Sequence, residues 1–486
     1  MLEKLAKQTA IYGISTILGR FLSYLLTPFY TRIFGAESYG IITDVYALIP
    51  FALVTLTLGM ESAYFRFAAK AEAAGGDIEQ QKRRLFTTMW GITSLASLIF
   101  FALVTLFRSE VSAVMGEAYV ANPAYVVIVA AIVMFDVMGC IPFSRLREQR
   151  RALLFVTLKL LNIILQVALA FLFWAVGLFD TEFGVGWAFV ANLLASVITT
   201  LIVMVVGKTL PRIQWAMLGV IFAYSLPLLL SSIAGTAGEF IDRQLIKYLI
   251  PEGSMAQLGI YGAITKIAVV MTLFTQMYRL AAEPFFLSNF RKEEFVEMNA
   301  AALKYYMIAS MLIFLGIALF RDLFALIVGS EFRQGIYILP IVLGANILSG
   351  VWLNLSFWYK REEKTRYALW VTLSGLAASV IAGYLLIPRY GYFGAAWSRF
   401  VAEVVMVGVS LTMNRICYPT PYDFRRIAEY VAVGLALFFI TESIPQLSTA
   451  IQYTLNALLF VTYAMYVVRR ERIDIKGLAD SILKRR

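Results

Sequence analysis

The residues best suited to do chemistry in this sequence are ionisable side chains that stand inside long apolar stretches. Arg20, Asp136 and Lys266 lie near the middle of such stretches. A charge near the centre of a bilayer costs at least about 2.5–3.5 kcal/mol on insertion scales, so it is expected to face a polar interior or an opposite charge. These three side chains therefore predict either a charged cavity within the membrane or an ion pair of Asp136 with Arg20 or Lys266.

Further charged side chains lie nearer the ends of their apolar stretches. Arg279 and Lys159 are long enough to reach lipid headgroups instead of a cavity. Glu61 has only a cation five residues away, which is a poor spacing for a helical ion pair. Glu239 and Arg243 are four residues apart, so they can neutralise each other on one helix face. The sequence leaves open which of these side chains line a cavity.

Charged side chains without a local partner are mostly cations. The predicted substrate-binding residues are Arg20, Lys266, Arg279 and Lys159. A cavity of low dielectric with this charge attracts an anion, and a phosphate group most strongly. The candidates for coupling to H⁺ or Na⁺ are Asp136, Glu61 and Glu239. Asp44 is expected to be a cap or loop contact, and Arg399 and Glu403, four residues apart, are expected to neutralise each other.

The chemistry of most enzymes is missing from this chain. There is no His, and the two cysteines, Cys140 and Cys417, are too far apart in sequence to form a CxxC motif. Gly207-Lys208-Thr209 resembles the end of a phosphate-binding loop but lacks the preceding glycine of that motif. We therefore expect no catalytic residue, no metal and no cofactor, and a transporter in place of an enzyme.

The composition explains why these charges stand in apolar stretches. Of 486 residues, 60% are hydrophobic and only 15% are charged, whereas a soluble protein has about 25% charged residues. We predict an all-α polytopic membrane protein with about 14 transmembrane helices of roughly 20 residues each. The predicted spans are 9–31, 43–66, 85–107, 123–144, 153–178, 187–206, 216–238, 258–282, 302–328, 335–358, 368–387, 394–413, 428–445 and 449–468.

The net charge of +11 indicates the orientation of the chain in the membrane. Most of the 42 Lys and Arg residues fall in the even-numbered connections and at the two ends. Cytoplasmic connections carry an excess of Lys and Arg, so both termini are predicted to be cytoplasmic. The basic excess therefore reports membrane topology, and no nucleic-acid partner is expected.

Two short sequence matches suggest an internal repeat. Residues 39–43 (YGIIT) resemble residues 261–265 (YGAIT), and the glycine-rich turn at 184–188 resembles the one at 391–396. We predict two pseudo-symmetric six-helix lobes, 1–206 and 207–427, followed by two further helices and a basic tail, 428–486. Parallel repeats of this kind enclose a cavity between the halves. The alternative is that small residues simply recur at helix starts.

Three segments together resemble Wzx-type polysaccharide flippases of the multidrug/oligosaccharidyl-lipid/polysaccharide exporter superfamily. They are 19–40, with Gly19-Arg20-Phe21 and Arg32–Gly40; 242–261, with Asp242-Arg243 and Leu258–Tyr261; and 386–396. The resemblance implies alternating access and a cargo of undecaprenyl-pyrophosphate-linked oligosaccharide, moved to the outer leaflet of a bacterial inner membrane. It also implies a cavity arginine at Arg20, and partners among membrane lipids, a polysaccharide polymerase and the chain-length machinery.

Three other functions stay open at this point. A lipid II flippase differs only in its cargo. A multidrug/cation antiporter of the same superfamily would have a cavity dominated by acids and usually 12 helices. A membrane glycosyltransferase or polymerase would need a catalytic carboxylate on an outer loop, and the predicted loops are short.

Overall fold

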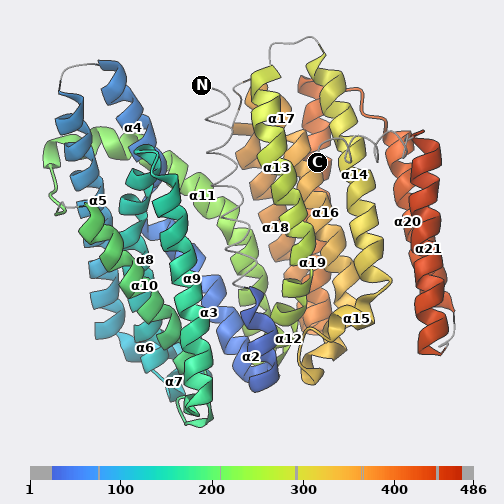
Figure 1. The fold of residues 1–486 in the computed structure, drawn as a ribbon, viewed down its shortest axis with the longest axis horizontal. Coiled ribbons are helices and arrows are strands. Elements are labelled where there is room, and N and C mark those ends of the chain that lie inside the picture. Colours follow the sequence, from blue (N-terminus) through green and yellow to red (C-terminus); the bar gives the residue numbers. More distant parts are fainter. Residues whose placement is uncertain are drawn as a thin grey trace, which may run out of the picture. The chain divides into compact units, whose positions relative to one another are not determined.

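A computed structural model describes residues 24–74, 77–207, 210–289, 294–362, 364, 366–444 and 448–472. These residues form helices and no β-strand (Figure 1). An apolar helix satisfies its own backbone hydrogen bonds, as a segment surrounded by lipid must. The prediction of an all-helical polytopic membrane protein is confirmed.

The number of membrane-spanning helices is lower in the described residues than the sequence predicts. Eleven helices are long and apolar enough to cross a membrane, or twelve if the bent pair α12 and α13 is one span. The first predicted span lies mostly outside the described residues. The thirteenth corresponds to α20, in which Arg425, Arg426, Glu429 and Glu442 occupy a helix of 20 residues. Fourteen spans therefore stay a prediction.

Contacts within the chain define two compact units, Met1–Gly262 and Ala263–Arg486, with the division inside α12. The predicted lobes, 1–206 and 207–427, are a different division of the chain and stay a prediction. In the first unit α8 packs against α5 and α10, α10 against α9, and α11 against α3. The helices of this unit are α2 (Leu26–Ile33), α3 (Ala36–Leu56), α4 (Met60–Ala74), α5 (Ile78–Leu106), α6 (Arg108–Met115), α7 (Glu117–Ala121), α8 (Ala124–Glu148), α9 (Ala152–Ala175), η1 (Leu178–Asp180), α10 (Gly186–Gly207), α11 (Trp215–Leu249) and α12 (Ser254–Ile267).

In the second unit α19 packs against α18 and α16, and α14 packs against α16, α20 and α21. Gly391 has a φ of 57° in the turn between α18 and α19, a conformation that glycine adopts without strain. The helices of this unit after α12 are α13 (Val269–Asn289), α14 (Phe295–Ala318), α15 (Arg321–Ala325), η2 (Ser330–Ile338), α16 (Leu339–Leu355), α17 (Phe357–Arg361), α18 (Arg366–Tyr390), α19 (Tyr392–Cys417), α20 (Phe424–Ser443) and α21 (Thr449–Arg470).

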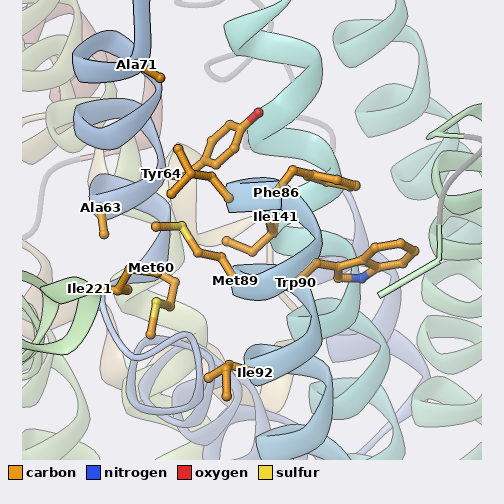
Figure 2. Packing of buried hydrophobic residues seen from close by; sticks show 11 residues of the cluster. Met60, Ala63, Tyr64, Ala71, Phe86, Met89, Trp90, Ile92, Ile141 and Ile221 are labelled. Carbon is orange, nitrogen blue, oxygen red and sulfur yellow. The ribbon is translucent and has the colours of Figure 1, made fainter. Parts of the chain in front are cut away.

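An apolar cluster fixes the relative positions of α4, α5, α8 and α11 in the first unit. Figure 2 shows Met60 and Tyr64 of α4 close to Met89 of α5 and Ile141 of α8. Trp90 of α5 lies at the edge of the same cluster, and its indole N–H donates to the Met138 carbonyl at 3.0 Å. A buried indole with its donor satisfied fixes the register of α5 against α8. The helices that carry the charged side chains of this unit are therefore held in place by a packed apolar core.

Candidate transport site

The predicted substrate-binding residues lie in both units. Arg20 is outside the described residues. Lys159 lies in α9 of the first unit, and Lys266 and Arg279 lie in α12 and α13 of the second.

Lys266 stands next to a break in a membrane helix. It lies in the last turn of α12, and α13 continues after a bend of 47°. A cation in the last turn of a helix is stabilised by the partial negative charge of the free carbonyl groups there. Broken membrane helices of this kind are a common way for transporters to present backbone polar groups to a substrate.

Hydrogen bonds link the helix break to polar side chains of α16 and α19. The side-chain N–H of buried Asn346 donates to the Ala268 carbonyl at 3.3 Å. The side-chain oxygen of Asn346 accepts a hydrogen bond from Arg399 at 3.4 Å. The sequence does not predict the contact with Asn346, because it offers Glu403, four residues after Arg399, as the partner of that arginine. Lys266, Asn346 and Arg399 thus supply two cations and an amide beside the helix break in the second unit.

Arg279 has a local carboxylate partner. Its guanidinium lies 3.4 Å from Glu283 of the same helix, and the side chain is 60% exposed. The other oxygen of Glu283 accepts from Lys360 of α17 at 2.7 Å. One carboxylate therefore offsets two cations here.

Lys159 and Asp136 are neighbours in the first unit. The Lys159 ammonium lies 4.2 Å from the ring centre of Phe143, at the distance of a cation–π contact. The Asp136 carboxylate has the Ser196 hydroxyl and the charge of Lys159 as its polar neighbours. The sequence analysis instead offers Arg20 or Lys266 as partners of Asp136, because Lys159 lies near the end of its span and could reach lipid headgroups.

Glu61 is also paired across helices. Its carboxylate accepts from Arg147 of α8 at 2.7 Å, and the thiol of Cys140 lies 3.8 Å from the second oxygen. Both partners are about half exposed, at 45% for Glu61 and 42% for Arg147. The side chain of Glu239, the third coupling candidate, lies outside the described part of α11.

The most buried ion pair among the described residues of the first unit involves Asp44, whose role the sequence did not reveal. Asp44 of α3 accepts hydrogen bonds from Lys247 at 2.6 Å and from Gln244 at 2.7 Å, both from α11. Tyr119 of α7 donates a third at 2.7 Å. The Asp44 and Lys247 side chains are only 1% and 4% exposed. We call Asp44, Tyr119, Gln244 and Lys247 the Asp44 cluster.

The protonation of Tyr119 suits its role as a donor in this cluster. Burial, and then the adjacent Asp44 carboxylate, raise the pKa of Tyr119 well above its usual value. The phenol therefore keeps its proton and donates to Asp44. With three donors on one carboxylate, the buried negative charge is well compensated.

Close backbone packing holds α3 in position beside this cluster. A Cβ placed on Gly40 would come within 1.9 Å of the Met255 carbonyl oxygen, and one on Gly259 within 2.0 Å of the Ala36 carbonyl oxygen. Only glycine permits α3 and α12 to approach so closely, as at small-residue helix crossings in membranes. Gly40 is four residues before Asp44, so both lie on one face of α3.

The sequence does hold a signal for the Asp44 cluster. Gln244 and Lys247 are three residues apart, which places both on one face of a helix. That signal was hidden because α11 continues to Leu249, whereas the sequence predicts that the span ends at 238. The sequence therefore predicts a cap or loop contact for Asp44, whereas the structure shows it as a buried partner for α11.

The ion pairs between helices agree with the predicted alternation of the spans. Arg147 pairs with Glu61 on the face predicted to be inner, and Lys247 pairs with Asp44 on the face predicted to be outer. The same agreement holds for Lys82–Glu148, Lys304–Glu471, Arg321–Glu442 and Lys360–Glu283. In the described residues, no group of three or more Cys, Asp and Glu side chains could hold a metal ion.

The fold defines the class of the molecule, which is an all-helical polytopic membrane protein. Residues 5–290 match the model of the family described as polysaccharide biosynthesis protein. The chain is 23% identical to a probable low-salt glycan biosynthesis flippase of Haloferax volcanii, over 81% of this chain and 79% of that protein. It is also 26% identical to the capsular polysaccharide biosynthesis protein CapF of Staphylococcus aureus, over 38% of this chain and 47% of that protein.

Solved structures show the same fold at low sequence identity. The lipid II flippase MurJ in an inward closed conformation superposes with a TM-score of 0.76 at 14% identity, covering 96% of this chain and 100% of that chain. An inward-facing MATE multidrug transporter of the MOP superfamily gives a TM-score of 0.66 at 17% identity, covering 82% and 94%. The chain belongs to the polysaccharide biosynthesis protein family of Wzx-like flippases. The predictions of this family and of a transporter in place of an enzyme are confirmed.

Proposed function

We propose that this protein moves an undecaprenyl-pyrophosphate-linked oligosaccharide from the inner to the outer leaflet of a bacterial inner membrane. The cargo would be a repeat unit of O-antigen, capsule or exopolysaccharide. The observation that carries this proposal is the family match over residues 5–290, supported by the glycan flippase relative. A polysaccharide polymerase and its chain-length machinery would act on the delivered cargo.

The proposed architecture is two six-helix lobes, 1–206 and 207–427, with fourteen spans and both termini in the cytoplasm. The same-face ion pairs described above support the alternation of the spans. Alternating access would then open the space between the lobes to one side of the membrane at a time.

The cargo carries its negative charge on the pyrophosphate, so the cations are proposed to bind that group. Arg20 and Lys266 are the first candidates, because both lie near the middle of apolar stretches. Lys266 also stands at a helix break near Arg399. Lys159 and Arg279 are second candidates, since Asp136 and Glu283 already offset their charge. H⁺ or Na⁺ coupling is assigned to Asp136, Glu61 and Glu239.

The Asp44 cluster is proposed to hold the outer side closed. Asp44 belongs to the first predicted lobe and Lys247 to the second, and both lie on the face predicted to be outer. Release of cargo to the outer leaflet would require these hydrogen bonds to break. A buried ion pair suits such a contact, because both of its charges are readily hydrated once the contact opens.

The test is an in vivo translocation assay of Arg20→Ala and Lys266→Ala at matched expression. We expect each variant to lose at least about tenfold in transport, because an uncompensated pyrophosphate is expensive to place within a membrane. Arg108→Ala is the matched control, since Arg108 is an exposed cation at the start of α6. Wild-type transport in both test variants would rule out binding of the cargo by these cations.

The cargo is tested by complementation. The gene should restore surface polysaccharide to a strain that lacks its own polysaccharide flippase and should fail to rescue a strain depleted of its lipid II flippase. Rescue of the second strain alone would favour the lipid II alternative. Increased drug resistance without any glycan phenotype would favour the multidrug antiporter.

A further inference from the structure

A large cavity lies on the first unit, and none of the candidate transport residues described above lines it. Its volume is about 1460 Å³, and it is bounded by α5, α8, α10 and the segment 210–214 that leads into α11. Its α5 wall consists of residues that share one face of that helix. They are Gln80, Arg83, Arg84, Thr87, Trp90, Ser94 and Leu98.

One end of the cavity is strongly basic. Arg83, Arg84 and Arg212 line it, and none of its described lining residues is acidic. The neighbouring Lys82 behaves differently, because it pairs with both Glu72 and Glu148. The three arginines thus bring three positive charges to one opening, on the face predicted to be cytoplasmic.

The position of Arg212 relative to α5 is fixed by its backbone. The N–H of Arg212 donates to the Thr87 carbonyl at 3.1 Å, and the N–H of Gln214 donates to the Thr88 hydroxyl at 3.3 Å. Gly91 leaves room for Ile213, whose side chain lies 2.7 Å from where a Cβ on Gly91 would stand. The basic opening is therefore preformed in the absence of a ligand.

The remainder of the α5 wall runs into the membrane. At 1.5 Å per residue, Arg84 and Leu98 are separated by about 21 Å, which exceeds the roughly 15 Å of one hydrocarbon leaflet. Trp90 and Leu98 of α5, together with Met204 and Val205 of α10, make this part of the cavity mostly apolar. Ser94 is 8% exposed and lines the cavity, and its hydroxyl has no hydrogen-bond partner among the described residues.

We infer that this cavity binds an anionic phospholipid of the inner leaflet. The phosphodiester lies between Arg83, Arg84 and Arg212, and one acyl chain follows α5 past Trp90 toward Leu98. Basic pockets between membrane helices on the cytoplasmic side are suited to anionic headgroups. The bound lipid would brace the connection between α10 and α11, whatever the cargo of the transporter is.

The test is native mass spectrometry of the full chain in detergent, titrated with phosphatidylglycerol. At about a fivefold contribution per cation, we expect Arg83→Gln/Arg84→Gln/Arg212→Gln to weaken binding roughly 100-fold to 200-fold. The control, Lys70→Gln/Arg151→Gln/Arg469→Gln, removes three exposed cations of the same predicted face that do not line the cavity. It should leave the affinity near that of the wild type.

Three results would overturn the proposal. Equal losses in the two triple variants would mean that surface charge alone attracts the lipid. Equal binding of phosphatidylethanolamine or of glycerol 3-phosphate would remove the need for an anionic lipid. Tighter binding of undecaprenyl phosphate than of phosphatidylglycerol would make the cavity a cargo site.

A second variant keeps the test valid if the triple variant does not fold. Leu98→Trp preserves the three arginines and narrows the apolar part of the cavity. It should weaken phosphatidylglycerol binding more than Leu95→Trp, which alters an exposed leucine of the same helix outside the cavity. Equal affinity in these two variants would contradict the placement of the acyl chain.

Discussion

Asp44–Lys247 and Glu61–Arg147 are two ion pairs of one unit that differ mainly in their burial. The first pair is 1% and 4% exposed, with two further donors on the carboxylate. The second is 45% and 42% exposed. Desolvation dominates the energetics of a buried pair, whereas water and salt screen an exposed one. Loss of one partner is therefore expected to be costly where an ion pair is buried and nearly neutral where it is exposed.

Removing one partner of the buried pair should have the largest effect. Lys247→Met leaves the Asp44 carboxylate buried with only its two neutral donors. A loss of about 3–5 kcal/mol in the free energy of unfolding is expected for an uncompensated buried charge. The measurement is denaturant unfolding of the purified protein in detergent.

The double variant Asp44→Asn/Lys247→Met is the control for charge. It removes both charges, keeps an acceptor oxygen for Gln244 and places an amide NH2 that can donate to the Tyr119 hydroxyl, so it should be more stable than Lys247→Met alone. If the single variant is as stable as the wild type, the pair is hydrated in solution and the comparison with Glu61–Arg147 fails.

Gly40→Ala tests whether the packing of α3 keeps the Asp44 cluster buried. The new Cβ would collide with the Met255 carbonyl, which is backbone and cannot rotate away. We expect a loss of about 1–3 kcal/mol. Gly219→Ala in α11 is the control, because a Cβ there meets nothing within 4 Å. That control should be neutral or stabilise the helix by up to about 1 kcal/mol.

Breaking the exposed pair should change stability by at most about 1 kcal/mol, for either Arg147→Gln or Glu61→Gln. High salt should abolish the difference from the wild type, since screening already weakens an exposed pair. Transport assays of the same variants separate coupling from stability. Glu61→Gln should alter the dependence of transport on H⁺ or Na⁺ if Glu61 carries the coupling ion, whereas unchanged dependence would remove it from the candidates.

The sequence predicts the all-helical membrane fold well because twenty-residue apolar stretches have few other structures available in lipid. It locates charges such as Lys159 and Lys266 along their spans for the same reason. It could not pair Asp44 with Lys247, because their contact joins positions 203 residues apart and depends on how α3, α7 and α11 pack. The burial of an ion pair is thus a tertiary property, even where each charge is obvious in the sequence.

The Glu471 site of the second unit extends the comparison to pH and should show the smallest effect. Burial opposes ionisation of Glu471, but hydrogen bonds from Lys304 and Tyr430 outweigh it and lower its pKa. A lowered folded-state pKa contributes stability above the unfolded value, near 4.5, and that stability is lost as the pH falls through the folded value. The wild type should therefore lose stability more steeply than Glu471→Gln between about pH 5 and pH 3. Parallel curves would mean that the lysine and the tyrosine contact this carboxylate without favouring its charge, as expected for a pair screened by water.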